Sequence, residues 1–476
     1  MSERAAGVGR PAGGRGRPRG PRSARTTDLP RQAAYEAVAA VHRDDAYGNL
    51  VLPALLRDLR LQGRDAAFAT ELTYGTLRNR GTLDVILAAA AGREIDRIDP
   101  PARDALRLGA YQLLHTRVPP HAAVSSTVDL VRSVAPGAAG FANAVLREVS
   151  TKDAESWISE LAPPFEADPI AHLAMAYSHP QWIVRAFAEA LDGDLAETTR
   201  LLIEDNERPG VHLCARPGRA DAVELADEVG GAPGAFSPYA VYLPGGAPGE
   251  LAALADGRAH VQDEGSQLVT TALVEAPVEG VDVRWLDLCA GPGGKAALLG
   301  ALAAERGATV TAVEVAEHRA RLVRQAVEGM PVTVQHADGR SVGSDPDLPE
   351  QGFDRVLVDA PCTGLGSLRR RPESRWRRQT SDLPPLTRLQ RELLGAALRA
   401  VRPGGVVAYS TCSPHLVETR VTVAEAMRRA KVPADLLDAR ALLPPGMPGL
   451  GDGPMVQLWP HRHGTDAMFL AVLRRR

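Results

Sequence analysis

Apolar residues recur at helical spacing from about residue 30 to residue 150. In 33–41 and 105–114, alanine, valine and leucine return every three or four positions, as on the buried face of a helix. Glycine and proline interrupt the pattern at Gly48, Gly63, Gly81, Gly92, Pro119-Pro120 and Pro136-Gly137. These breaks predict about six helices. We therefore expect an all-helical domain over residues 29–150.

The helical periodicity weakens after residue 150. Residues 151–169 are polar and contain proline, which predicts a linker. Residues 170–262 include a Gly- and Pro-rich stretch with short apolar runs, Val211–Cys214 and Ala240–Leu243. Such runs favour short strands, so we expect a small α/β module.

Short apolar strands alternate with amphipathic helices in the last part of the chain, residues 263–476. The predicted strands are Val283–Leu288, Thr309–Val313, Val332–Gln335, Arg355–Val358 and Val406–Ser410. This alternation is typical of a Rossmann-like α/β domain, whose mostly parallel sheet carries helices on both faces. Met455–Trp459 and Met468–Leu473 predict an antiparallel hairpin at the sheet's C-terminal edge.

Composition changes this picture mainly at the N-terminus. The formal net charge is −3, but residues 1–25 hold seven arginines against the single acid Glu3, so we expect residues 1–28 to be a disordered tail. No apolar run approaches the roughly 18 residues of a membrane helix. The tail also lacks the apolar core of a secretory signal, so we expect a cytoplasmic protein without a membrane partner. The four cysteines are too scattered for a zinc pattern and too few for a disulfide scaffold, and we expect no metal.

Ligand chemistry is expected at the carboxyl ends of the parallel strands. The first strand ends in Asp287-Leu-Cys-Ala-Gly-Pro-Gly-Gly-Lys295, whose glycines let a ligand approach the backbone. The spacing matches neither the dinucleotide fingerprint nor the P-loop. The next strands end at Glu314, suited to a ribose diol, and Asp338, suited to an adenine amino group. Each acid alone is more often a solvated loop residue, but their placement at successive strand ends favours a binding site.

Two thiols follow the remaining parallel strands. Cys362 ends the turn Asp359-Ala-Pro-Cys362, and Cys412 lies in Ser410-Thr-Cys-Ser413. A single cysteine is usually a small buried hydrophobe. Two cysteines on the ligand-facing rim indicate a reactive pair, in which a thiolate acts as nucleophile.

Together these motifs resemble the Sun (Fmu) family of RNA cytosine-5 methyltransferases, and within it the bacterial enzymes of small-subunit ribosomal RNA, over nearly the whole chain. Residues 262–267 and 371–377 are similar to further family motifs, and 72–77 and 141–146 resemble a NusB-type RNA-binding domain. Val417-Glu-Thr419 departs from the family's more usual Glu-Glu-Asn. The departure leaves the proposed thiols and acids intact but makes the choice of substrate less certain.

The resemblance implies S-adenosylmethionine as methyl donor and a set of residues around it. Its binding residues would be Cys289, Ala290, Gly291, Pro292, Gly293, Gly294, Lys295, Glu314, Asp338 and Asp359. Cys412 would attack C6 of a cytosine, Asp359 would hold the base at N3 or N4, and Cys362 would assist release of Cys412. Lys295 would orient Asp359 or neutralise nearby charge.

A buried base must be single-stranded or flipped out before a thiol can reach it, so a basic surface should guide the RNA. Arginines cluster around one tryptophan just after the Cys362 turn. They are Arg369, Arg370, Arg371, Arg375, Arg377 and Arg378, with Trp376 as a stacking surface. The alternative is a solvated loop without contact to RNA.

Three alternatives stay open from the sequence. A DNA cytosine-5 methyltransferase would use Cys362 as nucleophile instead of Cys412. A non-catalytic RNA-binding protein would use the helical domain and the arginines alone. Within the preferred class, transfer RNA is the main alternative to small-subunit (16S) ribosomal RNA, and a monomer is the simplest expectation.

Overall fold

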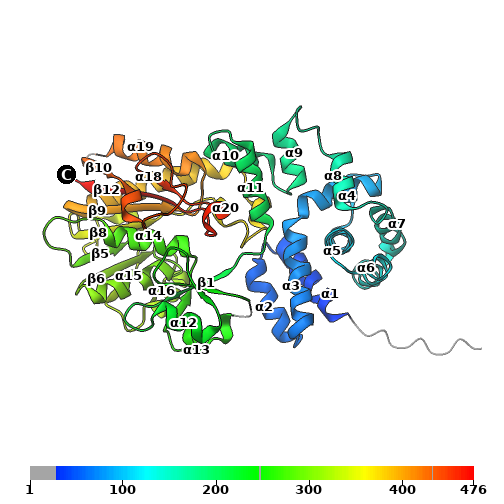
Figure 1. The fold of residues 1–476 in the computed structure, drawn as a ribbon, viewed down its shortest axis with the longest axis horizontal. Helices are drawn as coiled ribbons and strands as arrows, with labels where there is room; N and C mark the ends of the chain where they lie inside the picture. The colour runs from blue at the N-terminus through cyan, green and yellow to red at the C-terminus, as the bar shows by residue number, and fades with distance from the viewer. Residues whose placement is uncertain (1–27, 246–247, 431) are drawn as a thin grey trace, which may run out of the picture.

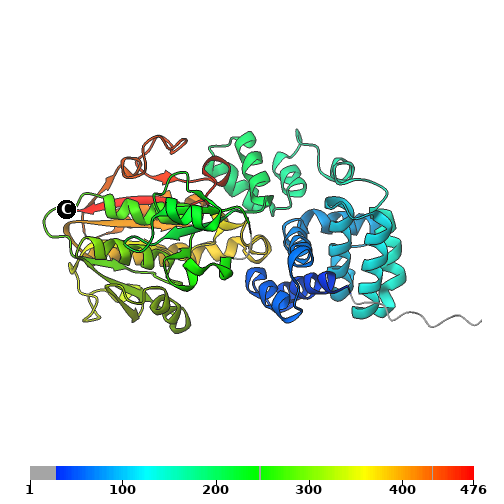
Figure 2. The ribbon, with the colours of Figure 1, turned by 60° about the horizontal axis from the view of Figure 1, so that its bottom comes forward.

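The computed structural model describes residues 28–245, 248–430 and 432–476. The Arg-rich tail predicted for residues 1–28 lies almost entirely outside these described residues. Figures 1 and 2 show a helical part beside a larger α/β part. Within the described ranges, no helix is both long and apolar enough to cross a membrane.

The first part is an all-helical domain, as predicted. Its seven α-helices, one more than predicted within residues 28–150, are α1 (Leu29–Arg43), α2 (Gly48–Asp58), α3 (Gly63–Arg78), α4 (Arg80–Ala91), α5 (Pro100–His115), α6 (Pro120–Val134) and α7 (Ala139–Val149). Asp28 starts α1, because its carboxylate accepts from the backbone N–H of Arg31. Gly75 lets α3 lie against α5, since a Cβ there would be 2.0 Å from Cζ of Tyr111.

The predicted linker is wrong in one respect, because residues 151–169 contain helix α8 (Ala154–Leu161). Trp157 on α8 is buried in the core of the helical domain, and its ring N–H donates to the carbonyl of Val149 at 3.1 Å. Burial of this large side chain fixes α8 on the helical domain. A polar composition therefore concealed a helix that is held by one aromatic residue.

The predicted small α/β module consists of two pieces with separate cores. Three helices, α9 (Pro169–Ala176), α10 (Gln181–Ala190) and α11 (Leu195–Asn206), bury apolar residues against Leu365, Leu368 and Trp459 of the last domain. An antiparallel sheet in the order β2-β3-β1-β4 follows, with its own apolar core. Its elements are β1 (Val211–Ala215), α12 (Ala222–Val229), β2 (Ala232–Pro233), β3 (Ala240–Leu243), α13 (Ala252–Ala255) and β4 (Ala259–Val261).

The last part confirms the predicted Rossmann-like domain. The five predicted parallel strands are β5 (Arg284–Asp287), β6 (Thr309–Glu314), β7 (Val332–His336), β8 (Phe353–Asp359) and β9 (Val401–Thr411). They lie in the order β9-β8-β5-β6-β7, so strand order reverses between β5 and β8. β12 (Phe469–Arg475) pairs antiparallel with β9, and the short β11 (Val456–Gln457) pairs with β12. The edge itself is β10 (Ala434–Leu437), a strand that the sequence pattern did not predict.

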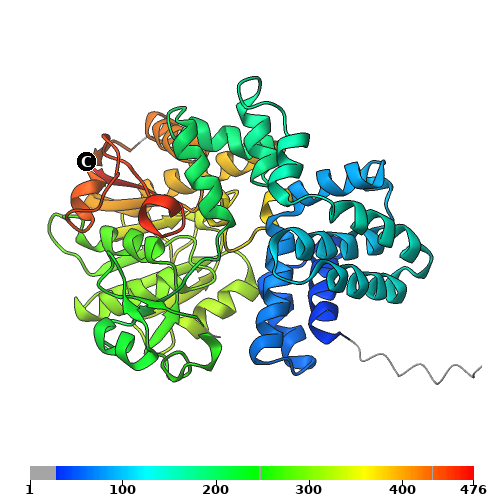
Figure 3. The ribbon, with the colours of Figure 1, turned by 45° about the vertical axis from the view of Figure 1, so that its right-hand side comes forward.

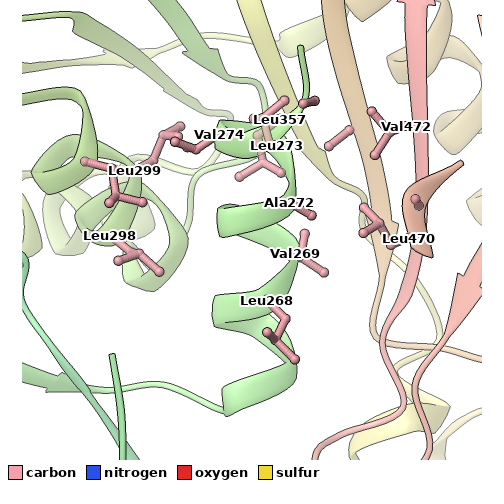
Figure 4. Packing of buried hydrophobic residues seen from close by; sticks show 14 of the residues in the cluster. Leu268, Val269, Ala272, Leu273, Val274, Leu298, Leu299, Leu357, Leu470 and Val472 are labelled. Atoms are coloured by element: carbon pink, nitrogen blue, oxygen red, sulfur yellow. The ribbon is translucent and has the colours of Figure 1, made fainter. Parts of the chain in front are cut away.

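Helices cover both faces of this sheet. Apolar residues of α14 (Glu264–Glu275) and α15 (Gly294–Glu305) form one core with the sheet, which Figure 4 shows around Leu268, Leu298 and Leu470. α16 (Glu317–Ala326) packs beside α15. α18 (Leu383–Ala400) and α19 (Arg420–Arg429) form the core of the opposite face. This layering leaves the carboxyl ends of the strands as the edge at which a ligand can bind.

Candidate active site

One pocket of about 330 Å³ lies along the carboxyl ends of the parallel strands. It is lined by residues that follow all five strands, and these include Cys289, Glu314, Asp338, Asp359, Cys362 and Cys412. The structure therefore brings together both predicted thiols and three of the predicted acids. Ala290, Pro292, Gly293, Gly294 and Lys295 do not line the pocket, and they shape the turn behind it.

Glu314 is held rigidly at the end of β6. The side chain is buried, and its two carboxylate oxygens accept from the backbone N–H groups of Gly291 (3.1 Å) and Ala316 (2.9 Å). Gly291 is required here, because a Cβ at this position would be 2.1 Å from Oε2 of Glu314. Each carboxylate oxygen keeps a second lone pair for a ligand.

Asp338 lines the pocket at the far end of the sheet, after β7. Arg340 occupies much of its acceptor capacity, donating from Nη2 at 2.6 Å, and this contact lowers the pKa of Asp338. Leu389 and Leu393 of α18 line the same pocket and provide apolar surface for a flat ring. Acidic side chains on a partly apolar pocket suit a nucleoside that carries a positive charge, and the residues present therefore fit S-adenosylmethionine.

The two thiols are in direct contact. Sγ of Cys362, after β8, lies 3.4 Å from Sγ of Cys412, after β9. Contact with Cys412, together with burial, raises the pKa of Cys362 well above its usual value. Burial also raises the pKa of Cys214 and of Cys289. These shifts favour the neutral thiol in Cys214, Cys289 and Cys362.

Asp359 lies beside the thiols in a network of hydrogen bonds. Nζ of Lys295 donates to its Oδ2 at 2.9 Å, and Oγ of Ser410 donates to its Oδ1 at 3.0 Å. Burial of Lys295 opposes its charge, but the Asp359 carboxylate outweighs burial and raises the pKa of Lys295. The ion pair fixes the carboxylate and keeps it as a hydrogen-bond acceptor.

Asp287 is a second carboxyl in this region that motif reading did not single out. It is buried at the end of β5, and its Oδ2 has no hydrogen-bond partner among the described residues. Burial, followed by the charge of Asp359, raises the pKa of Asp287 to about 7.

Glu418 is another residue whose role the sequence analysis did not identify. It is fully buried and accepts four hydrogen bonds: from the backbone N–H of Thr363 (2.8 Å), from Oγ1 of Thr363 (2.5 Å), from Oγ of Ser413 (2.7 Å) and from Nε2 of Gln390 (3.0 Å). Thr363 follows Cys362 and Ser413 follows Cys412, so one carboxylate ties the two thiol loops together. The sequence feature that could have identified this residue is the glutamate of Val417-Glu-Thr419, which follows the Cys412 motif.

The predicted RNA-binding arginines are mostly structural. Arg369 and Arg375 are buried, which removes them from any surface that contacts RNA. Arg369 lies among Glu204, Asp263 and Asp466, and Arg370 pairs with the last two at 2.8 Å. The sequence alone predicted a basic patch here, because the acidic residues that pair with these arginines are far away in the chain.

The segment Arg371–Arg378 joins the helical domain to the active-site loop. Nη1 of Arg375 donates to Oδ1 of Asn206 at 2.6 Å, and Arg377 pairs with Asp45 at 2.7 Å. Trp376 packs on Gly81 of α4, where a Cβ would be 2.4 Å from Cη2 of the indole. Arg371 is exposed, and with Arg378 it lines the pocket.

Comparisons with known proteins agree with this geometry. A family model described as 16S rRNA methyltransferase RsmB/F matches residues 255–474, and one described as NusB family matches residues 28–151. A methyltransferase of Mycobacterium tuberculosis is 59% identical over 460 residues, covering 96% of this chain and 99% of the relative. The ribosomal RNA small subunit methyltransferase B of Escherichia coli is 33% identical over 436 residues, covering 89% of this chain and 96% of its own length.

The solved structures show the same fold. The crystal structure of PH0851 superimposes with a TM-score of 0.77 at 23% identity, covering 94% of this chain and 98% of its own. The family matches confirm the resemblance seen in the motifs, including the NusB-like helical domain and S-adenosylmethionine as cofactor. The chain belongs to the RsmB/F family of S-adenosylmethionine-dependent ribosomal RNA methyltransferases.

Proposed function

We propose that this protein methylates C5 of a cytosine in small-subunit (16S) ribosomal RNA, in the cytoplasm, with Cys412 as the nucleophile. The contact between Cys362 and Cys412, at 3.4 Å and beside the Lys295–Asp359 ion pair, carries the proposal. A thiol pair next to a fixed carboxylate suits covalent attack on a pyrimidine that is otherwise unreactive at C5.

Cys412 and Cys362 each have one task in the proposed reaction. The Cys412 thiolate forms a C–S bond to C6 of the cytosine, which places electron density on C5. S-adenosylmethionine, when bound, would supply the methyl group to C5 and would be left as a neutral thioether. After the C5 proton passes to solvent, the C5–C6 double bond re-forms and Cys412 leaves, while the neutral Cys362 thiol donates its proton to the departing sulfur.

Asp359 would hold the base in place. Lys295 and Ser410 keep its carboxylate an acceptor, which matches the N4 amino group of cytosine as donor. A uracil offers a carbonyl at this position and would leave two acceptors facing each other. The carboxylate therefore selects cytosine as well as orienting it.

The cofactor would lie along the remainder of the pocket. We assign Glu314 to the ribose hydroxyls and Asp338, beside Leu389 and Leu393, to the adenine. Cys289 and Gly291 line the pocket between these ends, and Ala290, Pro292, Gly293 and Gly294 would hold the loop in the shape that admits the ligand. Lys295 would act through Asp359.

The test uses RNA that carries 5-fluorocytosine, which traps the adduct because fluorine at C5 cannot leave as a proton. Wild type and Cys362→Ala should form a denaturant-stable complex, and Cys412→Ala should form none. Cys214→Ala, a buried thiol outside the site, is the matched control. Loss of the complex in Cys362→Ala with retention in Cys412→Ala would reverse the two roles, as in the DNA-type alternative.

Substrate class needs a separate measurement. Bisulfite sequencing of RNA from cells with and without the gene should show one small-subunit rRNA cytosine that loses its methyl group and regains it only with wild type. An unchanged rRNA pattern with a lost tRNA signal would assign the protein to transfer RNA.

A further inference from the structure

A tyrosine of the helical domain lines the pocket that holds the thiols. Tyr47 caps the N-terminus of α2, and its side chain belongs to the same pocket as Asp359, Cys362 and Cys412. Figure 3 shows the helical domain, blue to cyan, against the α/β part. The active site is therefore built from both parts of the chain.

The loop that carries Tyr47 is firmly attached to the α/β part. Asp45 pairs with Arg377 at 2.7 Å, and the carbonyl of Ala46 accepts from the same guanidinium. The backbone N–H of Gly48 donates to Oε1 of Glu373 at 3.2 Å. Contacts on both sides of Tyr47 thus fix its position over the pocket.

Tyr47 nevertheless keeps 40% of its surface exposed. The guanidinium carbons of Arg371 and Arg377 lie 5.4 Å and 4.9 Å from its ring centroid. Arg371 is exposed and lines the pocket as well, whereas Arg377 is committed to the Asp45 loop. An exposed aromatic ring beside an exposed guanidinium offers the two kinds of flat surface on which unpaired RNA bases stack.

The position of this pair favours RNA over the cofactor as its ligand. Arg371 follows the Cys362 turn after β8, and the acids assigned to the cofactor follow β6 and β7. β5 separates β8 from β6 in the sheet. The pair therefore belongs to the thiol end of the pocket, where the target base must enter.

We propose that Tyr47 and Arg371 form a stacking platform for an RNA base that flanks the target cytosine. The helical domain would then determine substrate specificity from within the active site, in addition to any RNA contact on its outer surface. This inference rests on the function proposed above, because it requires that RNA reach Cys412 through this pocket.

The test is a steady-state comparison of variants on unmethylated small-subunit rRNA. Tyr47→Ala should lower kcat/KM for RNA by about 5- to 150-fold, the range for loss of one stacked base, and leave the KM for S-adenosylmethionine within about twofold. Tyr47→Phe and Tyr47→Trp keep a flat ring and should stay close to wild type. Phe165→Ala, an exposed aromatic residue that does not line the pocket, is the matched control.

Substitution of Arg371 tests stacking without disturbing the fold, because its side chain is exposed. Arg371→Ala should lower kcat/KM for RNA, and Arg371→Lys, which keeps the charge without the plane, should not restore it fully. A Tyr47→Ala variant that matches Phe165→Ala, or one that raises only the KM for the cofactor, would overturn the proposal. If the wild type yields a methylated base other than 5-methylcytosine, the proposed function is wrong. The comparison of kcat/KM between the Tyr47 variants and the wild type would still test the stacking platform.

Discussion

Glu418 should be essential for the geometry of both thiols, although it touches neither sulfur. Glu418→Ala removes the acceptor of four hydrogen bonds in a fully buried position. The hydroxyls of Thr363 and Ser413 already lie 3.1 Å apart and can pair with each other. The backbone N–H of Thr363 loses its acceptor, and so does one of the two N–H groups of Gln390 Nε2, whose other N–H donates to the carbonyl of Pro361 at 2.8 Å.

Each buried donor that loses its partner costs about 1–3 kcal/mol, so the two together should lower the free energy of unfolding by about 4 kcal/mol. For a domain of this size, such a loss corresponds to a fall in Tm of about 8–16 °C. The kcat should fall as well, because the turns after Cys362 and Cys412 are no longer held together.

Differential scanning calorimetry and the 5-fluorocytosine trapping rate measure the two effects. Glu418→Gln keeps an acceptor for the two N–H donors and should recover most of the Tm. Glu425→Ala, a partly exposed glutamate of α19 that pairs with Arg391 at 3.2 Å, is the control and should change neither quantity appreciably. A Glu418→Ala protein with unchanged Tm and trapping rate would refute the reasoning.

Three further substitutions test the neighbouring contacts. Lys295→Met removes the cation that holds Asp359, and kcat should fall about 10- to 150-fold, the value of one charged hydrogen bond, with Lys295→Arg closer to wild type in the same methylation assay. The pKa of Asp287 is raised to about 7 from 3.8, so the stability of the wild type should decline as pH rises from about 4 to 7. The Tm measured across this pH range should decline less in Asp287→Asn. Parallel curves of Tm against pH for the two proteins would contradict this. Gly81→Ala places a Cβ against Trp376 and should destabilise the joint between the two parts by about 1–3 kcal/mol, whereas Gly137→Ala, with open space around it, should have little effect on Tm.

The sheet and its rim could be predicted because both depend on local sequence. The apolar runs of β5, β6, β8 and β9 are mostly buried, the edge strand β7 is partly buried, and the carboxyl ends of all five meet at one edge by topology alone. Glu314, Asp359 and Cys412 therefore reach one pocket, although they are up to 98 residues apart in the sequence. β10 was missed because a strand of four residues at an edge needs no strong apolar pattern.

The arginines could not be assigned from sequence, because their roles depend on partners in other elements. Arg375 donates to the carbonyl of Asp205 and to Asn206, both on α11, and Arg370 meets Asp263 and Asp466. Pairings between segments more than 90 residues apart leave no periodicity in the chain. A cluster of one charge sign is thus ambiguous until its counter-charges are located.

The arginine segment connects the helical domain to the loop of Cys362. Nε of Arg378 donates to the carbonyl of Thr363, next to Cys362, at 3.1 Å, and the adjacent Arg377 holds the Asp45 loop. Arg375 is fully buried and donates to the carbonyl of Asp205 on α11, which anchors the segment. An RNA bound to the helical domain would therefore meet Cys412 at a fixed separation, and the base that reaches the thiol would be selected by its distance from that bound element as well as by its contacts in the pocket.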